Sequence, residues 1–249
     1  KLDGNQLGLF NALKRSGYET SIYLPEDTPF APDRLMFSVF GANKVVIPKE
    51  SDIQQGEWSD VLQTTLKDFP YYSSISEAEK QPFERMLIND LVSLDQMLTD
   101  VRHMARAGEK FSSLFLPSIG HGPWPKQTPE STLLETGAEI FALQDKWIGQ
   151  ILKMLEEEGI ADNTIVVVTA DHGLRTSAEY PSLALGVLNE VSFHVPLIIY
   201  APNATQKKID IDYLTSHIDI TPTILSLLGI DQTKMSKLIK AIYFFINNV

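Results

Sequence analysis

The stretch DNTIVVVTADHG, residues 162–173, decides the fold class that the sequence predicts. Its run TIVVVT, residues 164–169, is apolar or β-branched on successive residues, which is typical of a central strand that is covered on both faces. The run leads directly into Asp171, His172 and Gly173, and ligand sites in open α/β sheets lie beyond the carboxyl ends of strands. The sequence therefore predicts a buried parallel strand that ends at a candidate site.

Other short β-branched segments alternate with amphipathic segments on both sides of this stretch. Strands are predicted over residues 20–24, 44–47, 111–116 and 195–201, and helices over residues 6–15, 82–107, 139–158 and 221–228. Strands that alternate with helices indicate a largely parallel sheet, so the predicted fold class is α/β. Residues 48–80 are polar and irregular in pattern, and we interpret them as an insertion.

The composition excludes several classes of function. With 21 Lys and Arg against 32 Asp and Glu, the 249-residue chain has a formal net charge of −11. Nucleic-acid and anionic-membrane binders need clustered positive charge, so neither class is expected, and an anionic substrate would need a local cation such as a metal ion. The absence of cysteine excludes disulfides, thiolate metal sites and a cysteine nucleophile within this stretch. No apolar run reaches the ~18 residues of a membrane span.

The strongest candidate site is the Asp171-His172 pair at the end of the 164–169 strand. Gly173 tolerates the backbone bend that lets the two neighbouring side chains converge on one ion. A carboxylate oxygen and an imidazole nitrogen together suit Zn or Mn, and suit Ca or Mg less well. The alternative is an ordinary Asp-His-Gly turn with a capping Asp.

Three other segments carry histidines near predicted strands. His121 lies in a Gly- and Pro-rich loop after the 111–116 strand and suits an anionic ester oxygen, unless the loop is only a surface loop with Trp124 packed down. His194 precedes the 195–201 strand and either faces the site or simply enters the strand. The segment 216–229 is expected to be structural, with Asp219 or Thr221 capping a helix. His103 is expected on a helix surface.

Taken together, five segments resemble the sulfatase family of the alkaline phosphatase superfamily. They are GYET (17–20), GHGPW (120–124), DNTIVVVTADHG (162–173), the block from Glu190 to Pro202 with VPLIIYAP, and DITPTILSLLG (219–229). The resemblance implies an α/β sandwich around a mostly parallel sheet, forming one catalytic domain over residues 1–249. It implies a divalent-metal enzyme that cleaves or transfers sulfate or phosphate esters, with Asp171 and His172 as metal ligands and His121 on the substrate anion.

The sequence departs from the family pattern at several positions. The nucleophile and a further acidic ligand lie upstream of the GYET segment in the family, and neither can be placed here, so we interpret the chain as lacking that segment. The G-K-x-H pattern after this segment is absent, Leu185 replaces a Lys, and His194 replaces an Arg. These losses favour the phosphoester branch, such as lipoteichoic acid synthases and phosphoethanolamine transferases, in which Arg34 resembles a substrate contact.

The resemblance gives a set of expectations. The substrate is expected to be an anionic ester of a small molecule, a glycan or a lipid head group, bound at Arg34, His121 and His194. An extracytoplasmic location is expected, with any membrane anchor upstream of Lys1, and these 249 residues are expected to be inactive alone. Two alternatives stay open: a catalytically inactive sulfatase-fold binding protein, and an unrelated α/β binding domain that holds no stoichiometric metal ion.

Overall fold

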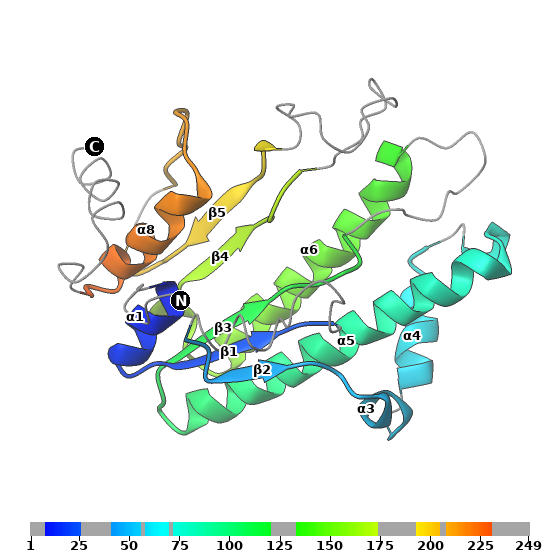
Figure 1. Ribbon diagram of the computed structural model, residues 1–249, viewed down its shortest axis with the longest axis horizontal. Helices are drawn as coiled ribbons and strands as arrows, with labels where there is room; N and C mark the ends of the chain where they lie inside the picture. The colour runs from blue at the N-terminus through cyan, green and yellow to red at the C-terminus, as the bar shows by residue number, and fades with distance from the viewer. Residues whose placement is uncertain are drawn as a thin grey trace, which may run out of the picture. The chain divides into compact units, whose positions relative to one another are not determined.

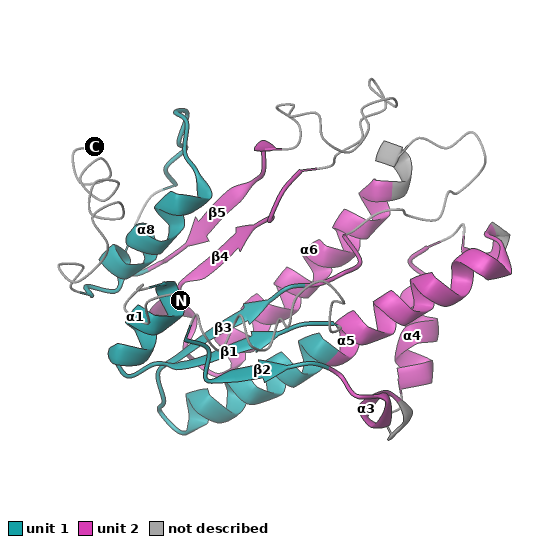
Figure 2. Ribbon diagram, in the orientation of Figure 1, with its two compact units in different colours: residues 1–47, 93–116, 203–249 teal, residues 48–92, 117–202 magenta. Residues whose placement is uncertain are grey.

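The computed structural model describes residues 8–25, 41–55, 58–69, 72–120, 133–173, 193–204 and 208–230. The chain divides into two compact units (Figure 2): unit 1 comprises residues 1–47, 93–116 and 203–249, and unit 2 comprises residues 48–92 and 117–202. The long helix α5 (Glu77–Arg106) contributes residues to both units. The assignment of residues 1–249 to one domain stays a prediction.

Unit 1 contains a parallel sheet of three strands (Figure 1). Its strands are β1 (Glu19–Tyr23), β2 (Lys44–Val46) and β3 (Phe111–Phe115), in the order β2-β1-β3. Ser21 pairs with Lys44 on one side and with Ser113 on the other, and both pairings are parallel. The three predicted strands and the α/β class, with a parallel sheet and helices, are confirmed.

Helices cover both faces of the central strand β1. Ile22 belongs to a cluster against which Phe10 of α1 (Leu9–Arg15) packs, whereas the Tyr23 hydroxyl donates to Asp100 Oδ2 of α5 at 2.7 Å. Successive side chains of a strand point to opposite faces, so α1 and α5 lie on opposite faces of the sheet. Both Ile22 and Tyr23 are fully buried, as a strand in the middle of a layered α/β structure requires.

The last described segment, residues 208–230, contains a helix that packs on α1. A short 3₁₀ helix, His217–Asp219, leads into α8 (Ile220–Leu227), and Ser216 and Asp219 form a capping box at its start. Leu225 of α8 is fully buried against Ala12 and Leu13 of α1. The structural role predicted for residues 216–229 is confirmed, with Asp219 as the residue before α8.

Removal of the Tyr23 hydroxyl is expected to change how stability depends on alkaline pH. Burial, reinforced by the hydrogen bond to Asp100 and its charge, raises the pKa of the Tyr23 phenol well above its ordinary value of 10.0. The folded state then holds this proton more tightly than the unfolded state, so the stabilisation is full below pH 10.0 and is lost as the pH rises above it. Tyr23→Phe should cost about 1 kcal/mol at neutral pH and should remove this alkaline loss.

Urea unfolding of both proteins at about pH 8 and about pH 11 measures this difference. Tyr213→Phe is the matched control, because Tyr213 is half exposed and should behave like the unchanged protein. Equal alkaline destabilisation of the protein with and without the Tyr23 hydroxyl would count against the assignment.

Residues 48–80, for which the sequence predicts no helix or strand, are largely helical in unit 2, and their interpretation as an insertion stays a prediction. This segment forms α3 (Glu50–Gln55), α4 (Trp58–Leu66), a 3₁₀ turn at Tyr72–Ser74 and the start of α5. Leu62 and Leu66, one turn apart on α4, are buried, and Phe69 makes an edge-to-face contact with Phe83, with ring centroids 5.3 Å apart. The polar residues that suggested irregularity belong to the exposed faces of short helices.

The start of α5 also differs from the prediction. The helix begins at Glu77 and not at Pro82, which lies inside it. The Ser76 hydroxyl donates to Glu79 Oε2 at 2.7 Å, and the Ser76 backbone N–H donates to the same oxygen at 3.3 Å. The Glu79 carboxylate thereby satisfies the Ser76 amide at the helix start, which favours the earlier beginning.

The remainder of unit 2 holds the helix α6 (Leu133–Glu157), a 3₁₀ turn at Ala161–Asn163, and the strands β4 (Val166–Thr169) and β5 (Leu197–Tyr200). The strand predicted over residues 164–169 is present as β4, but its predicted burial and parallel pairing are wrong, because β4 pairs with β5 antiparallel and its valines are half-buried. An apolar run indicates that a strand suits burial but carries no information on whether the neighbouring strand is parallel or antiparallel.

None of the described helices is both long and apolar enough to cross a bilayer.

Candidate functional site

Two polar side chains converge where β4 ends. The ladder finishes at Thr169, and Asp171 and His172 follow with side chains 71% and 39% exposed. His172 Nε2 lies 3.5 Å from Asp171 Oδ2, while Asp171 Oδ1 accepts the backbone N–H of His172 at 2.9 Å. The carboxylate and the imidazole therefore face one another and do not diverge.

The other ring nitrogen of His172 fixes the protonation pattern of the imidazole. Nδ1 lies 2.8 Å from the carbonyl oxygen of Gly173, and a carbonyl oxygen only accepts hydrogen bonds, so Nδ1 carries the hydrogen. In the neutral ring, Nε2 then presents its lone pair beside Asp171. A histidine that binds a metal ion through one nitrogen typically donates its other ring N–H in this way.

The separation of the two donor atoms fits a shared divalent ion. Two ligand atoms that each lie about 2.1 Å from a tetrahedral ion are about 3.4 Å apart, close to the 3.5 Å between Asp171 Oδ2 and His172 Nε2. Within the described ranges, no three His, Asp or Glu side chains gather into a possible metal site. The pair therefore fits two ligand positions of a site that needs at least one more.

His194 lies at the same end of the β4–β5 ladder as this pair. The antiparallel register joins Thr169 with Leu197, so the chain leaves β4 towards Asp171 and His172 at the same end of the ladder at which it enters β5 from His194. His194 is exposed. Among the described residues, it does not form a possible three-ligand metal site together with Asp171 and His172. The strand pairing thus brings His194 to the pair's end of the ladder, and its role in substrate binding stays a prediction.

A buried carboxylate that the sequence analysis missed holds the turn before His121. Asp90 of α5 is fully buried, and it accepts the Ser118 backbone N–H at 2.8 Å, the Ser118 hydroxyl at 3.1 Å and the Ile119 backbone N–H at 2.8 Å. Leu87 and Leu94, one turn away on either side of Asp90, are also buried. An Asp in the apolar stripe of a helix is the signal that marks such a residue.

Two of the predicted site residues lie outside the described residues. They are His121, which follows the turn that Asp90 holds, and Arg34. Their assignments to the substrate stay predictions.

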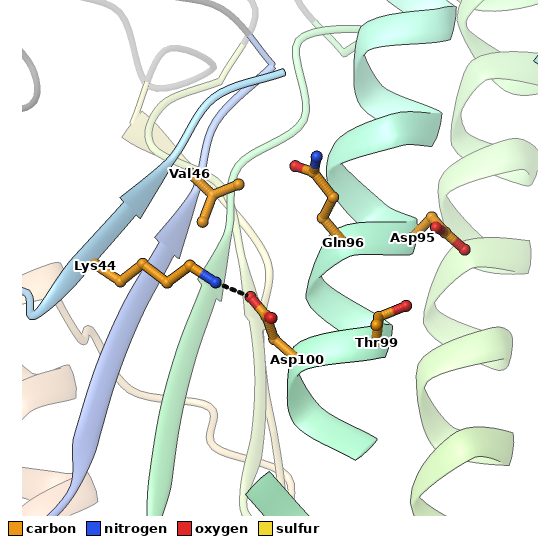
Figure 3. A pocket seen from close by; sticks show the side chains of 6 residues that line it. All are labelled: Lys44, Val46, Asp95, Gln96, Thr99 and Asp100. Carbon is orange, nitrogen blue, oxygen red and sulfur yellow. Dashed lines mark hydrogen bonds and ion pairs between the residues drawn. The ribbon is translucent and has the colours of Figure 1, made fainter. Parts of the chain in front are cut away.

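A polar cavity in unit 1 has a different character (Figure 3). It has a volume of about 320 Å³ and is lined by Lys44, Val46, Asp95, Gln96, Thr99 and Asp100. Lys44 Nζ and Asp100 Oδ2 form an ion pair across it at 2.5 Å. Lys44 begins β2, whereas ligand sites of parallel sheets lie at the carboxyl ends of strands. None of the predicted site residues lines the cavity, so it is not the candidate site.

A smaller cavity of about 170 Å³ shares Lys44 and Asp100 with this one. His103 also lines it and is exposed on α5, as the sequence analysis expects of a surface residue.

The chain is similar to known proteins over most of its length. A family model described as Sulfatase matches residues 1–230. Arylsulfatase K of Bos taurus is 35% identical over 91 residues, which are 36% of this chain and 16% of that protein. A protein named Sulfatase from Formosa agariphila is 29% identical over 152 residues, which are 57% of this chain and 28% of that protein.

Among solved structures, the lipoteichoic acid synthase LtaP from Listeria monocytogenes superposes with a TM-score of 0.64 at 17% identity. The superposition covers 95% of this chain and 57% of that chain. At this identity the similarity shows a shared alkaline-phosphatase-like fold. The chain therefore spans little more than half of its structural neighbour, and its matches span smaller parts of these curated relatives.

Proposed function

The chain belongs to the sulfatase family, and from this membership we propose that it forms part of a metal-dependent hydrolase or transferase of sulfate or phosphate esters. The observation that carries the proposal is the convergence of Asp171 Oδ2 and His172 Nε2 at the end of β4, at a separation that suits one shared ion.

The proposal assigns a role to each candidate residue. Asp171 and His172 hold a divalent ion (Zn, Mn, Ca or Mg), with a further acidic ligand from outside these 249 residues. Such an ion neutralises a non-bridging ester oxygen and activates a hydroxyl-type nucleophile. His121 stabilises the substrate anion or protonates the leaving oxygen, and Arg34 and His194 bind the substrate.

The substrate is proposed to be an anionic ester of a small molecule, a glycan or a lipid head group. Leu185 and His194 stand where typical sulfatases have Lys and Arg, which favours phosphate over sulfate esters. The net charge of −11 supports a bound cation as the group that holds such an anion. An extracytoplasmic location belongs to the same proposal.

The decisive experiment is calorimetric titration of the complete protein with Zn, Mn, Ca and Mg, followed by inorganic phosphate or sulfate. We expect one ion per chain, and anion binding that disappears with a chelator. With the 249 residues alone we expect no turnover of p-nitrophenyl phosphate or p-nitrophenyl sulfate, because the resemblance places no nucleophile within these residues.

Each result has a separate meaning. A complete protein that binds none of the four ions contradicts the metal-dependent function and favours a member of the family that holds no metal ion. Turnover that a chelator abolishes would show that the nucleophile lies within the 249 residues. A complete protein that binds ion and anion but turns over neither ester is the inactive binding protein.

A further inference from the structure

We draw no further inference here: the strongest candidate, the polar cavity between β2 and α5 that is lined by Lys44, Asp95, Gln96 and Asp100, carries none, because Lys44 and Asp100 pair with each other, Gln96 is only partly buried, and nothing in the described part of the chain shows what ligand would fill the cavity.

Discussion

Asp171→Ala is expected to abolish stoichiometric binding of a divalent ion by this chain. Removal of an outer-shell partner alone costs about 10–100-fold in metal affinity, so loss of a direct ligand should cost about 100-fold or more. The substitution removes Oδ2, which lies 3.5 Å from His172 Nε2, and leaves the imidazole as the remaining described donor of the pair. In the complete protein the same change should remove most turnover, because the substrate anion then loses its cation.

Calorimetric titration of the complete protein with Zn and Mn measures the loss directly. Asp162→Ala is the matched control, since Asp162 is an exposed carboxylate of the same unit in the 3₁₀ turn before β4. It removes the same charge from the protein and should leave the affinity unchanged. If Asp171→Ala and the unchanged protein each bind one ion with equal affinity, Asp171 is not a metal ligand.

Phe69→Ala is expected to lower the free energy of unfolding by about 3–5 kcal/mol. Phe69 is 1% exposed and stands edge-to-face against Phe83, which is 2% exposed. The truncation removes a large apolar surface from the interior and leaves a cavity between α5 and the segment that follows α4. Phe69 belongs to residues 48–80, which the sequence analysis interprets as an insertion, so this loss also tests whether that segment is part of the core.

Urea unfolding followed by circular dichroism measures the change. The control is Phe141→Ala on α6, because Phe141 is 49% exposed and its truncation should change stability by about 0.5 kcal/mol or less. Equal small losses for the two variants would show that residues 48–80 are peripheral after all.

The sequence predicts best those features that depend on local pattern. The parallel strands of unit 1 follow from short β-branched runs, and the long helices follow from apolar spacing. The convergence of Asp171 and His172 follows from their adjacency after a strand, with Gly173 to permit the bend. In each case the information lies within about ten neighbouring residues.

The features that the sequence does not predict depend on partners far along the chain. Only Leu62 and Leu66 of the described side chains of α4 are buried, so the sequence of this helix shows too few apolar positions to predict it. The antiparallel pairing of β4 depends on a strand about 30 residues later. Asp90 and Ser118 are 28 positions apart, and a side chain that bonds to a distant backbone leaves no local pattern except an acidic residue in an apolar stripe.

The pairing of Thr169 with Leu197 has a consequence for how this protein can vary. A shift of register by a single residue turns every side chain of a strand to the opposite face, so an insertion or deletion of one residue within β4 or β5 would change which side chains lie on each face of the ladder. Length changes between Gly173 and Phe193 leave the register untouched, because both ends of that interval are tied to the ladder. Length changes in this interval are therefore expected to be tolerated better than length changes within β4 or β5.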